Sequence, residues 1–383
     1  MKRFLCLALV PLFALALGVT PVLAAPSTDG PRATDGVGGG IRLNHLQARG
    51  SHNSYHRDPK WPGREHPTFG WDYSHSRLAR QFEEQGIRQI ELDVHWNWAR
   101  GEFEVYHAWF GDDRTTCELL RECLQEVRDW SDARPGHHPI MILVEPKDAM
   151  PPELPENGDP FTSAIGPAEL AELDRALVAP FGADRVLTPD DVTASGLTLR
   201  ESILSEGWPR IDALRGQVLY VIDGDADGAE YSANWMSLAG RSAFVQAEAD
   251  QPVAAFVSRD GARLPGEGKY DRMRRLVAQG FMVRDYVSPS EFEQSKAAGA
   301  HFLSTDDHDQ LVLSEDPDAP SRCNPVTAED ACTDARIEWH RAGGLTIPAD
   351  PDDEAATVVA EKVDRLAVHS AESAAAYASR QTP

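Results

Sequence analysis

The sequence predicts an α/β protein built as a TIM-type β/α barrel with irregularities, followed by a C-terminal extension. Short β-type runs alternate with helical patterns, which favours a parallel sheet. About eight strand candidates over roughly 270 residues match the strand number of such a barrel. An open, doubly wound sheet is the alternative, but no glycine-rich phosphate loop follows the first strand. We therefore expect a closed barrel.

The expected strands are short and mostly apolar. They cover residues 43–50, 87–96, 103–109, 138–148, 217–223, 242–249, 254–260, 281–287 and 301–307. The run 138–148 has a continuous apolar centre, which is typical of a strand buried on both faces. Helical spacing occurs at residues 78–86, 117–130, 167–182, 270–280 and 288–300, and Gly86 ends the first of these helices.

Both ends of the chain are expected to lie outside the barrel, which we place at residues 41–310. Residues 1–24 combine an early basic pair, an apolar run and a small-residue cleavage pattern, as in a secretory signal peptide, so we expect a secreted protein. The apolar run is shorter than the roughly 20 residues that span a bilayer, which argues against a membrane anchor. Residues 25–40 predict a flexible leader. Residues 311–383 predict an extension packed on the barrel, with an alanine-rich helical pattern near its end.

The charge balance limits the possible partners. The formal net charge is −24. Such an acidic protein should not bind nucleic acid through bulk electrostatics. An anionic lipid surface should also repel it, so we expect at most a transient contact with a membrane. The acidic exterior suits a soluble protein, and we expect a monomer.

Four cysteines remain after the signal peptide, as two close pairs: Cys117 with Cys123, and Cys323 with Cys332. In an exported protein an even count at short spacing predicts disulfides, and we expect the local pairing among the three that are possible. Free buried thiols are the alternative. A zinc site fits less well, because the spacings are six and nine residues rather than two to four.

Polar side chains gather at the C-terminal ends of the early strands, where the active sites of β/α barrels lie. They are His52, Asn53, Glu91, Asp93, His95, His107, Glu145 and Lys147. Alternation along a strand places Glu91 and Asp93 on one face. Burying several carboxylates together is costly unless a cation neutralises them. Oxygen ligands without thiolates favour calcium or magnesium over zinc. The alternative is a strand end with solvated acids.

The segments SHNSYH, IELDVHW, VYHAW and LVEPKD together resemble the metal-dependent phosphatidylinositol-specific phospholipase C barrel. The resemblance is closest to the secreted bacterial calcium-dependent group and covers about residues 41–310. It implies one calcium ion held by Asn53, Glu91, Asp93 and Glu145.

The same resemblance implies roles for the remaining polar residues. His52 and His107 resemble the two catalytic histidines, and Lys147 resembles a lysine that contacts the phosphate. Arg284 is a further candidate for an inositol or phosphate contact. Its alternative is a surface pair with the neighbouring Asp285.

The implied activity is that of a calcium-dependent phosphodiesterase acting on phosphatidylinositol or a soluble relative. The inositol 2-hydroxyl would attack phosphorus, giving a cyclic inositol phosphate and diacylglycerol. Glu91 or Glu145 would take the hydroxyl proton, and His107 would protonate the leaving oxygen. A glycerophosphodiester phosphodiesterase is the second interpretation, but it would carry His-Arg-Gly where this chain has Arg49-Gly50-Ser51-His52-Asn53. A third interpretation is a catalytically silent barrel that binds a lipid headgroup or another partner.

Overall fold

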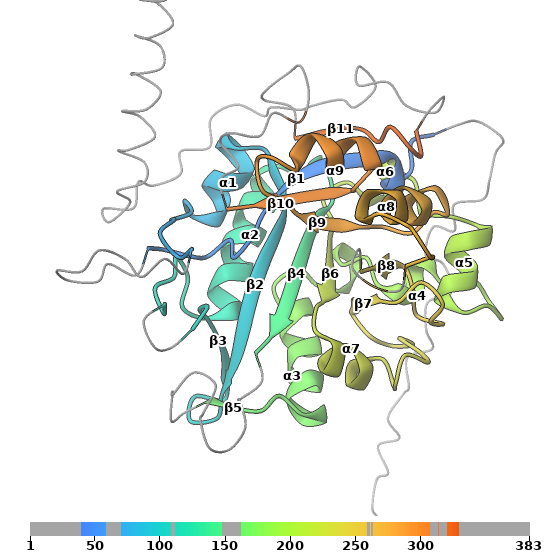
Figure 1. Ribbon diagram of the computed structural model, residues 1–383. Coiled ribbons are helices and arrows are strands. Elements are labelled where there is room, and N and C mark those ends of the chain that lie inside the picture. Colours follow the sequence, from blue (N-terminus) through green and yellow to red (C-terminus); the bar gives the residue numbers. More distant parts are fainter. Residues whose placement is uncertain are drawn as a thin grey trace, which may run out of the picture. The chain divides into compact units, whose positions relative to one another are not determined.

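A parallel sheet forms the centre of the molecule (Figure 1). The computed structural model describes residues 40–58, 70–108, 112–147, 162–258, 261, 263–306, 313 and 320–328. Eight strands follow the order β8-β7-β6-β4-β2-β1-β10-β9. They are β1 (Leu46–Ser51), β2 (Ile87–Asn97), β4 (Ile140–Pro146), β6 (Val218–Ile222), β7 (Ala243–Ala247), β8 (Phe256–Val257), β9 (Arg284–Tyr286) and β10 (Phe302–Thr305).

The two edge strands of this sheet also meet. Phe256 in β8 forms a parallel bridge with Met282, just before β9. The Met282 N–H donates to the Ala255 carbonyl at 2.9 Å, and the Val257 N–H donates to the Met282 carbonyl at 3.0 Å. The sheet therefore closes into a nearly complete barrel, which confirms the predicted fold class over the open sheet.

Three further strands pair antiparallel outside the ring: β3 (Glu102–Val105), β5 (Thr162–Ser163) and β11 (Ser321–Cys323). The prediction that residues 103–109 form a barrel strand is wrong. The strand there is β3, which folds back on β2 as a hairpin. The Asn97 side chain accepts hydrogen bonds from the backbone of Ala99 and Arg100, both at 3.0 Å, and so fixes the turn. The first strand also begins later than expected, because Leu43–His45 is a short 3-10 helix, η1.

Helices join most of the barrel strands. They are α1 (Leu78–Glu84), α2 (Leu120–Ala133), α3 (Pro167–Val178), α4 (Pro189–Val192), α5 (Leu199–Ser205), α6 (Ile211–Leu214), α7 (Asp225–Tyr231), α8 (Lys269–Ala278) and α9 (Phe292–Ala298), with a second 3-10 helix, η2 (Ala183–Arg185). Five expected helices correspond to α1, α2, α3, α8 and α9. Helices α4, α5, α6 and α7 were not expected, since segments of four to seven residues carry little periodicity.

Helix α2 illustrates how the sequence fixes the outer layer. Its apolar residues recur at helical spacing, and Leu120, Leu124 and Val127 are buried toward the barrel. The Cys117–Cys123 disulfide ties the preceding loop to the first turns of the helix, as predicted. Cys323 is also disulfide-bonded. Its predicted partner, Cys332, lies outside the described residues.

Several expectations concern parts of the chain that the structure does not describe. These are the signal peptide, most of the leader and the helical pattern near the C-terminus. One piece of the expected extension is described: β11 pairs with the start of β1, with Cys323 opposite Leu46. Among the described residues, no helix is both long and apolar enough to cross a membrane.

Candidate active site

The loop that leaves β1 supplies several polar side chains at once. Asn53 adopts a left-handed backbone conformation, with φ of 43°. The two neighbouring side chains have different partners: His52 contacts Asp306, and Asn53 contacts Tyr55. The buried Tyr55 hydroxyl donates to Asn53 Oδ1 at 3.3 Å. Burial raises the pKa of this hydroxyl, and the charge of Asp93 raises it further. Asn53 and Asp93 are therefore neighbours of one phenol.

Three carboxylates from β2 and β4 converge at the end of the barrel where these strands finish. Glu91, Asp93 and Glu145 each offer an oxygen, and these oxygens all lie within 4.8 Å of one another. Asp93 pairs directly with Glu145 in the strand register. Adjacent parallel strands thus place the alternating residues of both on one side, as the spacing predicted.

The cluster fits a hard divalent cation. Asp93 is fully buried, and neither of its carboxylate oxygens accepts a hydrogen bond of good geometry in the described structure. Burial raises the pKa of Asp93 to about 7, and the charges of Glu145 and Glu91 add to this effect against the opposing charge of Lys147. A cation among these oxygens would remove that penalty, and carboxylate oxygens are the donors that calcium prefers.

Two basic side chains neutralise part of the cluster. Lys147 Nζ lies 2.5 Å from Glu145 Oε1 and 3.1 Å from Asp93 Oδ2. Arg284, on β9, forms an ion pair with Glu91 and donates to the Ser304 hydroxyl at 3.0 Å. The Arg284 side chain is mostly buried and points to the site, so the alternative of a surface pair with Asp285 is wrong.

The first histidine, His52, is held by the carboxylate of Asp306, which follows the last barrel strand β10. His52 Nδ1 lies 2.8 Å from Asp306 Oδ1, and Nε2 lies 4.0 Å from Glu91 Oε1. The Tyr286 hydroxyl donates to the other Asp306 oxygen at 2.5 Å, and its ring lies 4.4 Å from that of His52. Burial lowers the pKa of His52, but the charges of Glu91 and Asp306 outweigh it, so the pKa is raised.

The second histidine has a similar arrangement. His107 Nδ1 lies 2.6 Å from Asp112 Oδ2, which leaves Nε2 for other partners. The charge of His107 acts to lower the pKa of Asp93, against the effect of burial. The loop from β3 that carries both residues is closed by paired backbone hydrogen bonds between Ala108 and Asp112, at 2.9 and 3.0 Å.

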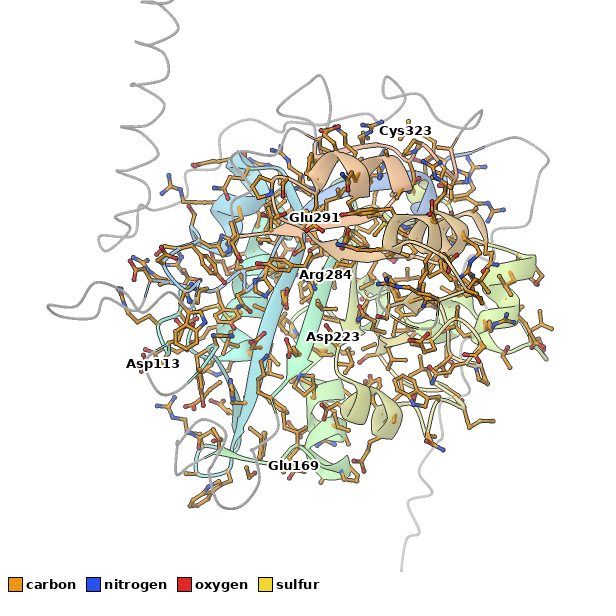
Figure 2. All side chains as sticks on the ribbon, in the orientation of Figure 1. Asp113, Glu169, Asp223, Arg284, Glu291 and Cys323 are labelled. Carbon is orange, nitrogen blue, oxygen red and sulfur yellow. A yellow bond between two sulfur atoms is a disulfide. The ribbon has the colours of Figure 1, made fainter. Side chains whose placement is uncertain are left out.

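Sequence reasoning missed the residues that orient the histidines. It assigned no role to Asp306 or Asp112. It also missed Asp223, at the end of β6, which receives a hydrogen bond from Gln246 at 3.1 Å. Burial raises the pKa of Asp223 to about 6, with Glu91 adding to the shift. Figure 2 labels Asp223 and Arg284 near the middle of the barrel.

His95 turns away from this chemistry, although it shares the strand alternation with Glu91 and Asp93. Its ring stacks on Tyr106 at 3.9 Å, and Nε2 lies 2.8 Å from the Tyr106 carbonyl. Burial lowers the pKa of His95 to about 3. His95 is therefore a neutral packing residue, and no role was predicted for it.

Comparisons with known proteins identify the family and the fold. The chain matches the family described as phosphoinositide phospholipase C, Ca2+-dependent, over residues 41–109 and 97–315. It resembles the calcium-dependent phosphoinositol-specific phospholipase C of a Pseudomonas species, at 17% identity and a TM-score of 0.50, over 74% of this chain and 96% of that one. The corresponding enzyme of Streptomyces antibioticus shows 18% identity and a TM-score of 0.49, over 70% of this chain and 96% of that one.

A search of curated protein sequences finds no match. The structural likeness, at such low identity, concerns the fold alone. The family match spans most of the chain and includes the three clustered carboxylates and both histidines. The chain therefore belongs to the calcium-dependent phosphoinositide phospholipase C family.

Proposed function

We propose that this protein is a calcium-dependent phosphodiesterase that cleaves phosphatidylinositol, or a soluble relative, by attack of the inositol 2-hydroxyl. The observation that carries the proposal is the meeting of Glu91, Asp93 and Glu145 between two histidines that are each held by a carboxylate. That set supplies a cation site, a base and proton donors.

One calcium ion would bind to Asn53, Glu91, Asp93 and Glu145. When bound, it would acidify the 2-hydroxyl and draw charge from a phosphate oxygen. Glu91 or Glu145 takes the hydroxyl proton, since their oxygens face the same point. The amide oxygen of Asn53 would be the one uncharged ligand of the set.

The remaining residues act on the phosphate and the leaving group. His52, Lys147 and Arg284 place positive charge where the phosphoryl oxygens gain negative charge. Asp306 keeps His52 in position, while Lys147 and Arg284 pair with Glu145 and Glu91 at the edge of the cation site. His107 donates a proton from Nε2 to the glycerol oxygen as the P–O bond breaks, since Nδ1 is already committed to Asp112.

Turnover of a panel of phosphodiesters tests this function. The panel contains phosphatidylinositol, glycerophosphoinositol and phosphatidylcholine, each with calcium or with excess chelator. We expect cleavage of the inositol substrates in calcium only. The Asp93→Asn variant is the control, because it removes one charge from the cluster while keeping the side-chain shape. Full turnover in chelator, or equal cleavage of phosphatidylcholine, would contradict the proposal.

A further inference from the structure

An aromatic segment lies against the loop that leaves β1. Residues 71–75, which we call the strap, have no regular secondary structure. Their side chains alternate along the chain: Trp71 and Tyr73 are partly buried and His75 is buried, whereas the two residues between them are exposed. The strap therefore presents one aromatic face to the molecule.

Contacts with the β1 loop fix the second half of the strap. The His75 N–H donates to the His56 carbonyl at 2.9 Å, and His75 Nε2 lies 2.8 Å from the His52 carbonyl. The Asn53 amide donates to the Tyr73 hydroxyl at 3.3 Å. The Tyr73 ring stacks on that of His56, with the ring centroids 4.2 Å apart. The strap is therefore held by the same loop that presents His52 and Asn53.

The first residue of the strap reaches the other histidine of the site. The rings of Trp71 and His107 meet at an angle of 76°, with their centroids 5.6 Å apart. His107 Nδ1 lies 2.6 Å from Asp112, and 26% of the His107 side chain is exposed. The indole of Trp71 is also partly exposed. A mainly apolar surface thus lies directly beside the residue that we assign as the proton donor.

The proton donor marks where the leaving group lies. A general acid acts at roughly 3 Å from the oxygen that it protonates, so the leaving oxygen is placed beside the His107 ring. In an in-line displacement this oxygen departs on the side of phosphorus opposite to the attacking hydroxyl. The first carbon atoms of the leaving group can therefore reach the indole of Trp71.

Other parts of the site are polar. Asp223 on β6 receives a hydrogen bond from Gln246 at 3.1 Å, and Arg284 on β9 donates to Ser304 at 3.0 Å. Such groups suit the inositol hydroxyls, which need hydrogen-bond partners when they leave water. The indole of Trp71 offers mainly apolar area instead, and this suits hydrocarbon.

We propose that Trp71 is a specificity-determining residue that contacts the leaving group and favours an acylated glycerol over free glycerol. This inference rests on the proposed function and narrows its substrate class to a lipid. The chemical step is unchanged. The 2-oxygen bonds to phosphorus, the bond from phosphorus to the glycerol oxygen breaks, and that oxygen keeps the electron pair and takes the proton from His107. Trp71 acts on the binding of the acyl-bearing end alone.

The preference between two soluble substrates tests the inference. We would measure kcat/KM in calcium for dihexanoyl phosphatidylinositol, below its critical micelle concentration, and for glycerophosphoinositol. The two share the inositol phosphate and glycerol and differ in the acyl groups. The wild type should prefer the lipid, and the ratio of the two values should fall roughly tenfold in Trp71→Ala, mainly through a higher KM for the lipid. Trp71→Phe should restore most of the ratio, because phenylalanine keeps an apolar ring.

Trp98→Ala is the matched control. Trp98 lies in the turn between β2 and β3 and is 58% exposed. Both substrates are monomeric, so binding to a lipid surface does not enter the comparison. The ratio should keep its wild-type value in Trp98→Ala. A fall as large as that in Trp71→Ala would show a general effect of losing a tryptophan and would overturn the inference.

The outcomes separate this role from the alternatives. If Trp71 only positions His107 or the inositol ring, Trp71→Ala slows both substrates by the same factor, and an unchanged ratio overturns the inference. A wild type that cleaves glycerophosphoinositol as well as the lipid also overturns it, while the proposed function stands. A wild type that cleaves neither substrate overturns the proposed function itself.

Product inhibition decides the question without a variant if Trp71→Ala does not fold. Dibutyrylglycerol and glycerol are added separately to the wild type during cleavage of glycerophosphoinositol. We expect dibutyrylglycerol to compete with the substrate at a concentration at least roughly tenfold lower than glycerol requires, because only the former carries apolar area for the indole. Equal inhibition by the two compounds would overturn the inference.

Discussion

The ammonium nitrogen of Lys147 lies 3.1 Å from Oδ2 of the fully buried Asp93. Lys147 therefore neutralises part of the negative charge of the carboxylate cluster in which we place calcium. A cation bound among the carboxylates would compete with Lys147 for them and would free the lysine to meet the substrate phosphate.

Replacing Lys147 by methionine should expose this competition. The metal-free variant should lose roughly 1–3 kcal/mol of stability, since buried carboxylates lose a charged partner. Calcium should then raise its melting temperature more than it does for the wild type. Lys269→Met is the matched control, because Lys269 pairs with Glu291 at 2.9 Å on the outer helix α8. Equal calcium shifts in all three proteins would contradict the assignment.

The stabilisation by calcium should depend on pH. The folded-state pKa of Asp93 is raised to about 7, so the metal-free fold binds more protons than the unfolded chain between about pH 4 and 7. Stability from this group is present at low pH and is lost as the pH rises through that window. Calcium must displace the proton, so its stabilising effect should grow from pH 5.5 to pH 8. Thermal unfolding with and without calcium measures this, and a constant or declining effect would exclude Asp93 as a ligand.

The effect of the two histidines on turnover should be separable from calcium binding. His52→Ala and His107→Ala should each lower turnover by at least about 10²-fold while calcium still stabilises the fold. The double variant should lose less than the product of the single losses, because both residues act on one transition state. Steady-state kinetics and calcium-dependent melting are the measurements. A variant with near-normal turnover would remove that histidine from the catalytic set.

The sequence was sufficient to find the carboxylate cluster but not the residues that support the site. Alternation along β2, with Glu145 on a second strand, reveals the carboxylates because strand geometry is regular. Asp306 meets His52 across 254 positions of sequence only because β10 lies beside β1 in the closed barrel. Asp112 reaches His107 through a short loop, whose conformation leaves no periodic signal.

The sequence also did not show whether a given strand pairs in the parallel or the antiparallel direction. An alternating run such as residues 102–105 fits a parallel barrel strand and an antiparallel hairpin equally well. The turn residues Asn97 and Gly101 decide for the hairpin, with a φ of 67° at the glycine. The barrel could therefore be predicted from the order of strands and helices. Whether β3 belongs to the barrel depended on the geometry of the turn before it.

The disulfide at the start of α2 should be a modest stabiliser. Cys117 and Cys123 are six residues apart, so their bridge closes a short loop. Replacing both by alanine should cost no more than about 2–3 kcal/mol in the chain-entropy model, with turnover retained. Denaturant unfolding measures the loss.

Peptide mapping of the wild-type protein without reduction would show whether Cys323 is bonded to Cys332. A bridge between the two pairs would refute the predicted local pairing.

The most direct test of the central claim is phosphorus NMR of the reaction with phosphatidylinositol in calcium. Attack by the neighbouring 2-hydroxyl is intramolecular, and effective molarities in such reactions reach about 10⁵ M or more. We therefore predict that the five-membered 1,2-cyclic inositol phosphate is the first product at the earliest time points. Appearance of only the open monophosphate from the start would contradict the account and would indicate a phosphodiesterase that uses water.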